Sequence, residues 1–218
     1  MTAVRIDASP PSVIETDAHV AEGARWLAAA EPRFAHALAV VDGVPLRRRP
    51  GGFATLLRAI CGQQLSVASA QAVWTKLEAA DACNAPGILA LDDDGLRACG
   101  LSRQKMAYAR ALAEADLDFE ALARVPEEEA IATLTAIKGI GVWTAEVYLM
   151  FAVGRPDVFA PGDLALQEGA RMLFDLPERP REKALRQMAG AWSPWRAVAA
   201  RLLWAYYAQA KSREGVDP

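Results

Sequence analysis

Hydrophobic residues recur with a helical period along most of the chain. Near residue 55, four of them have the spacing i, i+3, i+4 and i+7 and therefore share one face of a helix: Phe53, Leu56, Leu57 and Ile60. No stretch alternates convincingly between apolar and polar residues as a half-buried strand would, and no internal repeat is found. The pattern predicts an all-α fold.

Residues that favour helix ends divide this pattern into segments. Ser66 is a good N-cap, and Pro126 suits a first helical turn that also holds three glutamates near the positive end of the helix dipole. Residues 1–15 are expected to be a loose leader and 45–52 a linker. The expected helices are 17–40 (interrupted at Pro32), 53–61, 66–80, 86–91, 93–98, 102–115, 126–137, 142–153, 163–174, 181–189 and 193–212.

Two of these helices also indicate what they face. Residues 142–153 are apolar almost all round, with only Thr144 and Glu146 polar, which predicts a central, buried helix. In the last helix Trp204 lies about 180° from Trp195, the first residue of its apolar stripe, and therefore points away from the main core face. A second buried face and a functional side chain both fit this position.

Composition limits the class of protein. The chain has 218 residues, 53% of them hydrophobic, which is enough for one large domain or two small lobes. It shows no signal peptide and no run of about 18 uncharged apolar residues, so we expect a soluble cytoplasmic protein without membrane contact. Cys61, Cys83 and Cys99 lack CxxC spacing and predict buried free thiols rather than disulfides or a metal cluster.

Gly139-Ile140-Gly141 stands between two helical segments. Because neither glycine carries a Cβ atom, the backbone can turn sharply there and approach another surface closely. The next helix is expected to begin near Val142, so its first N–H groups lie beside this turn and form a positive concavity. Such a hairpin is suited to binding a phosphate oxygen.

A single aspartate, Asp163, follows Pro161-Gly162 twenty residues after Trp143. An aspartate at a helix start is commonly an N-cap, whose oxygen accepts backbone N–H groups. A carboxylate can equally stabilise an oxocarbenium-like sugar and orient or deprotonate a water molecule. By itself the residue leaves both interpretations open.

The stretches LTAIKGIGVWTA and VFAPGDLAL together resemble the helix-hairpin-helix DNA glycosylase superfamily, and more narrowly the DNA-3-methyladenine glycosylase II family. The resemblance covers roughly residues 50–210 and includes Phe53–Val73, Leu96–Ala115 and Trp192–Tyr207. It implies two helical lobes with a DNA- and base-binding cleft between them. Residues 52–154 would form the middle lobe ending in the hairpin, and 1–51 would pack with the C-terminal lobe, 155–218, which carries Asp163.

The resemblance implies a monofunctional glycosylase of base-excision repair. Such an enzyme flips an alkylated purine such as 3-methyladenine out of double-stranded DNA, hydrolyses its N-glycosidic bond and leaves an abasic site. Asp163 would be the catalytic residue. Bifunctional members carry a nucleophilic lysine where this chain has Trp143, so strand cleavage is not expected. No cofactor is expected for catalysis, no cysteine follows Cys99 to hold an iron-sulfur cluster, and we expect a monomer.

Further roles follow from the resemblance alone. Trp143 and Trp204 would stack on a cationic base, and Gln64 would fill the gap left by the flipped base. Trp143 as core packing and Gln64 as a solvated loop residue stay open, and Val147 replaces an expected pocket tyrosine. The expected substrate-binding residues are Trp143, Trp204, Tyr148 and Gln64; the DNA-binding residues are Gln63, Lys138, Gly139, Gly141 and Thr144; and a sodium-like ion would bind the backbone carbonyls of Thr135, Ile137 and Gly139.

The net charge of −3 and pI of about 5.5 are unusual for a DNA-binding protein. Two features would reconcile this charge with DNA binding. The hairpin would bind phosphate through backbone dipoles, and the acidic residues at 92–94 and 127–129 would lie apart from basic residues such as 47–49. Two alternatives remain. One is a glycosylase for a neutral lesion such as uracil, hypoxanthine or 1,N6-ethenoadenine; the other is a non-catalytic hairpin DNA-binding protein, which has no use for Asp163.

Overall fold

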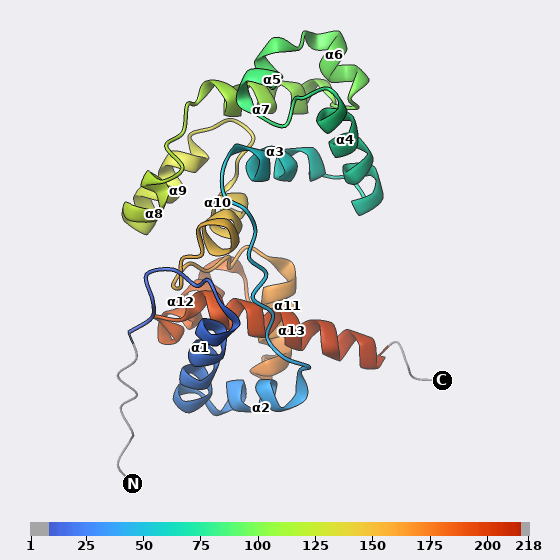
Figure 1. Cartoon of the computed structure of the whole chain (residues 1–218). Coiled ribbons are helices and arrows are strands. Elements are labelled where there is room, and N and C mark those ends of the chain that lie inside the picture. The colour runs from blue at the N-terminus through green and yellow to red at the C-terminus, as the bar shows by residue number, and fades with distance from the viewer. Residues whose placement is uncertain (1–8, 215–218) are drawn as a thin grey trace. The chain divides into compact units, whose positions relative to one another are not determined.

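The computed structural model describes residues 9–214, and all regular secondary structure in that range is helical, as predicted (Figure 1). The α-helices are α1 (Asp17–Ala30), α2 (Pro32–Val40), α3 (Phe53–Gly62), α4 (Val67–Ala79), α5 (Ala85–Ala90), α6 (Asp93–Ala98), α7 (Arg103–Glu114), α8 (Ala121–Arg124), α9 (Glu127–Thr135), α10 (Val142–Tyr148), α11 (Leu164–Leu173), α12 (Glu182–Ala189) and α13 (Arg196–Glu214). A π-helical turn, η1 (Leu149–Val153), and a 3-10 turn, η2 (Gly190–Trp192), complete the set.

The chain divides into two compact units. Residues 49–153 form one, with α3–α10 and η1, and within the described part of the chain residues 9–48 join residues 154–214 to form the other. The boundaries expected from the sequence follow residues 51 and 154. One unit is therefore continuous in sequence, and the other is built from both ends of the described chain.

In the unit formed by the two ends, α13 supplies the central apolar stripe. Trp195, Val198 and Leu202 are fully buried, as the periodicity predicted. Helix α11 approaches α13 closely at Gly169, where an added Cβ would lie 2.8 Å from the carbonyl oxygen of Leu203. The absence of that side chain sets the short separation between these two helices.

In the other unit, α3 is a central helix that packs against α4 and α7. Leu56, Leu57 and Ile60 are at most 1% exposed, so the predicted apolar face is the buried one. The backbone N–H of Ile140 donates to the carbonyl of Ile137 (3.0 Å) and closes the turn between α9 and α10. The expected hairpin between two helices is therefore present.

The helix expected over 142–153 differs from the prediction in two ways. Its α-helical part ends at Tyr148 and continues as the π turn η1, which accommodates one additional residue. Its first turn is also not buried, since Val142 and Trp143 are 47% and 48% exposed. Total apolarity was a poor guide to burial here, because apolar residues at the start of the helix are exposed to solvent.

Three smaller expectations were also wrong. Helix α8 was not predicted. The last helix begins at Arg196 rather than at 193, because the Asp157 carboxylate accepts hydrogen bonds from the Arg196 backbone N–H (3.2 Å) and the Ser193 hydroxyl (2.7 Å). The leader is held at Ile14, which is fully buried and donates its N–H to the carbonyl of Gly154 (2.7 Å). Residues 1–8 of the leader lie outside the described part of the chain.

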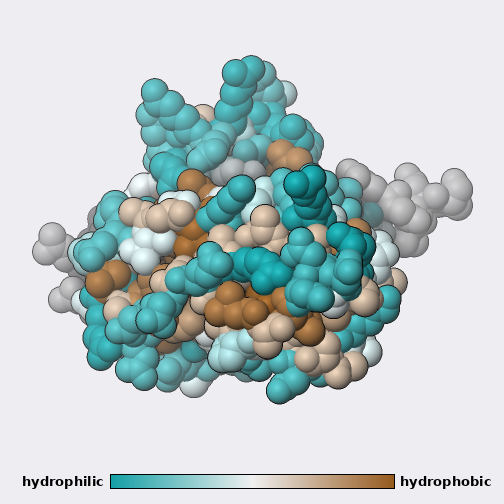
Figure 2. Space-filling view, turned by 90° about the horizontal axis from the view of Figure 1, so that it is seen from above, coloured by the Kyte–Doolittle hydropathy of each residue, from teal (hydrophilic) through white to brown (hydrophobic). Residues whose placement is uncertain are grey.

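Hydrophilic residues cover most of the face seen in Figure 2, with smaller apolar areas between them. Scattered apolar residues of this kind are common on protein surfaces and need no special explanation. In the part of the chain that the structure describes, no helix has both the length and the apolar character needed to cross a bilayer.

Candidate functional site

The chain leaves α3 through a tight turn over Gly62–Leu65. The Leu65 N–H donates to the Gly62 carbonyl (3.2 Å), and Gln63 has φ −55° and ψ 127°, as in the second position of a type II turn. Gln64 occupies the third position with φ 57°, which costs a residue other than glycine about 1 kcal/mol. Its side chain is exposed. The turn therefore presents Gln64 outward at a backbone angle that favours glycine.

The two hairpin glycines differ in their surroundings. Gly139 has φ 97°, and an added Cβ would lie 2.3 Å from Cγ of Tyr108. Gly141 has φ −88°, and nothing lies within 4 Å of its would-be Cβ. Of these two glycines, only Gly139 is required to be glycine by the fold.

A hollow of about 450 Å³, here called the hairpin hollow, lies beside this turn. Lys105 lines it and donates to the carbonyl of Cys61 at the end of α3 (2.7 Å), and burial lowers the pKa of Lys105. No carboxylate is among the residues that form its wall, which suits a phosphate despite the acidic chain. Its lining is Gln63, Gln64, Ser102, Gln104, Lys105, Tyr108, Gly139, Ile140 and Gly141.

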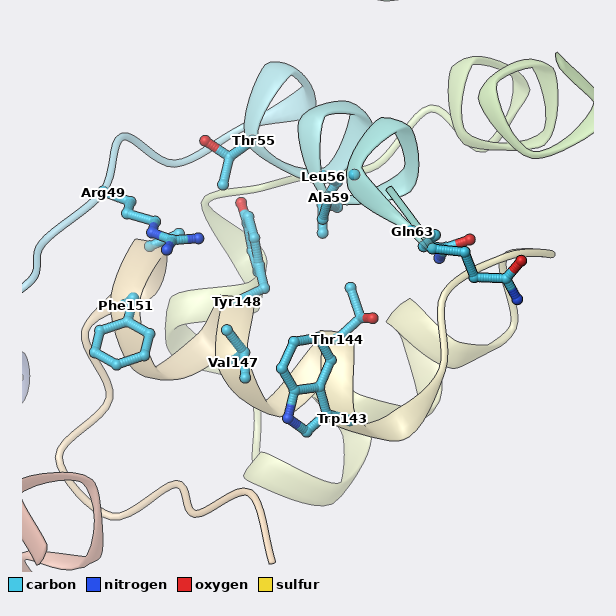
Figure 3. A pocket seen from close by; sticks show the side chains of 13 residues that line it. Arg49, Thr55, Leu56, Ala59, Gln63, Trp143, Thr144, Val147, Tyr148 and Phe151 are labelled. Carbon is cyan, nitrogen blue, oxygen red and sulfur yellow. The ribbon is translucent and has the colours of Figure 1, made fainter. Parts of the chain in front are cut away.

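A second, more apolar space of about 370 Å³, the Trp143 cavity, lies in the same unit between α3 and α10–η1. It brings together five residues predicted from the sequence: Gln63, Gln64, Trp143, Thr144 and Tyr148. Figure 3 shows Trp143, Thr144, Val147 and Tyr148 extending from α10, across the cavity from Leu56 and Ala59 of α3. The rest of the lining is Arg49, Thr55, Leu56, Ala59, Gly62, Val147, Phe151 and Ala152.

Tyr148 is held in this wall by the linker that precedes α3. Its hydroxyl oxygen accepts the backbone N–H of Gly52 (2.8 Å), and its side chain is almost fully buried. Burial raises the pKa of Tyr148, so the phenol stays protonated and neutral near pH 7. Val147, which replaces the tyrosine expected from the resemblance, lines the same cavity and contributes only apolar surface.

In the other unit, Asp163 is the N-cap of α11. Its Oδ1 accepts the backbone N–H groups of Ala165 (2.9 Å) and Leu166 (3.0 Å). The same oxygen accepts the indole Nε1–H of Trp204 from α13 (3.0 Å). The capping interpretation is therefore correct. The hydrogen bond from the Trp204 indole is an additional contact that capping α11 does not require.

The close approach of α11 to α13 at Gly169 allows this pairing across 41 positions of sequence. Trp204 remains partly accessible whereas Trp195 is fully buried, which agrees with the prediction that Trp204 lies off the main core face. A half-buried carboxylate held by three N–H donors keeps one orientation. Such a group is suited to stabilising positive charge.

The carbonyls expected to hold an ion lie on the hairpin. The Ile137 oxygen accepts the N–H of Ile140, and the Gly139 oxygen accepts Nε2 of Gln63 (2.9 Å). Each carbonyl oxygen has a second lone pair, so neutral oxygens suited to a monovalent cation fit this turn. Residues 9–214 contain no cluster of three or more His, Cys, Asp or Glu side chains suited to a metal ion. Lys138 is exposed and lines neither space.

Several residues of these walls were not predicted. Leu56 and Ala59 follow the helical spacing of α3, so their shared face could have indicated a cavity wall. Arg49 was noted only for its charge, and Phe151 enters the cavity from the π turn, for which the sequence carries no signal. Tyr108 supports Gly139 from α7, and no motif singled it out.

A family model described as "HhH-GPD superfamily base excision DNA repair protein" matches residues 57–194. The match includes the turn after α3, the glycine hairpin and Asp163. The chain belongs to this superfamily.

Relatives within the superfamily narrow the branch. The chain is 34% identical over 158 residues to "DNA-3-methyladenine glycosylase 1" of Schizosaccharomyces pombe, covering 68% of this chain and 69% of the relative. A crystal structure of a DNA-3-methyladenine glycosidase from Bacillus halodurans matches with a TM-score of 0.80 and 33% identity, over 87% of this chain and 91% of that one. The S. pombe 3-methyladenine DNA glycosylase in complex with abasic DNA matches with a TM-score of 0.70 and 28% identity, over 84% and 95%.

These similarities confirm the predicted family, the alkylation-repair branch of the helix-hairpin-helix glycosylases. They also confirm the helical glycosylase fold. The roles of individual residues depend on the geometry described above.

Proposed function

We propose that this superfamily member is a monofunctional DNA glycosylase that removes alkylated purines, chiefly 3-methyladenine, from double-stranded DNA by hydrolysis. The observation that carries the proposal is the Asp163 carboxylate, which three N–H donors hold, including the Trp204 indole. The names of its relatives as 3-methyladenine glycosylases support the same reaction. The product is a free base and an abasic site in an intact strand.

Asp163 acts on the sugar. As the bond between C1′ and the base nitrogen lengthens, positive charge develops on the deoxyribose, and the fixed carboxylate stabilises it. Water then attacks C1′ and loses its proton, which the carboxylate can accept. An alkylated base is already cationic and departs as a neutral molecule, so no acid is needed for the leaving group.

The Trp143 cavity is the proposed site for the flipped base. The exposed indole offers a π face to an electron-poor purine, and Thr144 and Tyr148 add hydroxyl groups to an otherwise apolar wall. Gln64, presented by the turn after α3, would fill the space that the base leaves in the duplex. These assignments give the exposed side chains of Trp143 and Gln64 a function.

The hairpin binds the DNA backbone. Gly139, Ile140 and Gly141 line a hollow without carboxylates, Lys138 directly precedes them in sequence, and Thr144 lies in the first turn of the helix that follows. A sodium-like ion on the carbonyls of Thr135, Ile137 and Gly139 would add positive charge there. We propose that one protein molecule acts alone on each lesion.

The test is a base-release assay with purified protein and duplex DNA that carries methylated purines. We expect release of 3-methyladenine by chromatography and no strand breaks until the abasic site is cleaved by alkali. Duplexes with uracil or hypoxanthine form the comparison arm. Release of those neutral bases without any methylpurine would replace the substrate assignment, and no release from any duplex would refute a glycosylase.

Replacing Trp204 with phenylalanine tests the indole bond. Trp204→Phe keeps most of the ring but removes the N–H that donates to Asp163. A hydrogen bond to a charged group contributes about 1.5–3 kcal/mol, so we expect single-turnover excision to slow roughly 10- to 100-fold. Duplex affinity should change little. Equal slowing in Trp192→Phe, which alters a buried indole of the same unit, would point to general destabilisation instead.

Replacing Trp143 with alanine tests stacking on a cationic base. Desolvated cation-π contacts contribute about 2 kcal/mol, so Trp143→Ala should reduce 3-methyladenine excision about 30-fold. The neighbouring Val142 is equally exposed, and Val142→Ala is the matched control, expected to retain activity. Single-turnover excision from a methylated duplex, in which the base is still cationic, measures both variants. An unchanged excision rate in Trp143→Ala would assign Trp143 to the surface rather than to the base.

A further inference from the structure

Gln63 lies in the turn that presents Gln64, but its side chain points to a different part of the fold. Its Nε2 donates to the carbonyl oxygen of Gly139 at 2.9 Å, across 76 positions of sequence. The bond is partly buried and belongs entirely to the unit of residues 49–153. It joins the end of α3 to the hairpin.

The hairpin is supported from a second direction by α7. The ring of Tyr108 lies where a side chain on Gly139 would be, with Cγ 2.3 Å from the would-be Cβ. Gln104, one turn earlier on α7, donates to the Tyr108 hydroxyl. Gly139 is thus held between an aromatic ring and the Gln63 amide.

We propose that Gln63 is a positioning residue that locks the Gln64 turn and the glycine hairpin into one rigid assembly. The inference rests on the proposed function, in which the hairpin grips a DNA strand and Gln64 enters the duplex beside it. The sequence analysis had placed Gln63 among the DNA contacts. In the proposed role it acts through Gly139 and needs no DNA to do so.

Rigid coupling of these two loops has a functional consequence. A side chain that fills a vacated base position must stand at a fixed distance from the phosphate that the hairpin holds. The strained φ of Gln64 and the required φ of Gly139 are both maintained by their surroundings. The Gln63 amide connects those surroundings, so the spacing is set before DNA arrives.

Hydrogen exchange in the DNA-free protein tests this directly. The Ile140 amide is protected by its bond to Ile137 inside the hairpin. Loss of one hydrogen bond predicts that Gln63→Met, similar in size but without a donor, exchanges this amide about 2- to 10-fold faster. Gln63→Glu, which brings a carboxylate to the Gly139 carbonyl, should exchange at least as fast. Gln64→Ala is the matched control and should leave the amide unchanged.

The kinetic arm uses duplex substrate with Gln63→Met. We expect KM to rise by a similar factor, with kcat at saturating DNA within about twofold of the wild type, because Gln63 does not touch the reacting atoms. Unchanged Ile140 exchange in both Gln63 variants would overturn the proposal, even if DNA affinity fell, and would return Gln63 to direct DNA contact. Exchange is measured without substrate, so this result is independent of whether the protein proves to be a glycosylase.

Discussion

Asp163→Asn should reduce 3-methyladenine release about 100- to 1000-fold while leaving the fold intact. Asparagine retains an oxygen that can accept from Ala165, Leu166 and the Trp204 indole, and it is as good an N-cap as aspartate. Only the negative charge is lost. The loss therefore acts on the sugar cation in the transition state and not on α11.

Single-turnover excision and thermal unfolding of the same sample separate these effects. Asp175→Asn is the control, since it removes one carboxylate from the exposed end of α11, where φ is 51° and asparagine is well tolerated. It should match the wild type in both measurements. If Asp163→Asn releases base at the wild-type rate, Asp163 is a helix cap and nothing more.

The helices were largely predictable because their signals are local. Apolar spacing identified the buried face of α3, and Ser66 marked the start of α4 with the expected capping bond to Ser69. The π turn at 149–153 had no such signal, since a segment that is apolar on every side has no preferred phase. Which part of it faces solvent was decided by the position of the hairpin.

The site was predictable as a set of residues but not as a set of contacts. Periodicity indicated that Trp204 turns away from Trp195, yet its partner Asp163 follows only from the approach of α11 to α13. The bond between Gln63 and Gly139 is equally invisible in the sequence. Such pairings depend on tertiary geometry, which motif spacing does not contain.

The two hairpin glycines illustrate the same limit, because the sequence treats them alike and the structure does not. Gly139→Ala should lower the free energy of unfolding by about 2 to 4 kcal/mol, since φ is 97° and the new Cβ would overlap Tyr108. Gly141→Ala should change it by less than about 0.5 kcal/mol, because its φ is −88° and the space around it is open. Thermal or denaturant unfolding without DNA measures both.

In a DNA-binding assay, Gly141→Ala should be impaired although its stability is normal. If a phosphate approaches the hairpin where Gly141 leaves open space, a Cβ there displaces it, and we expect about 10-fold weaker binding to an abasic duplex from a protein of normal stability. The loss should appear equally on undamaged DNA, because backbone contacts carry no base information. Wild-type DNA affinity of Gly141→Ala would mean that the phosphate lies elsewhere and that the open space at Gly141 does not contribute to DNA binding.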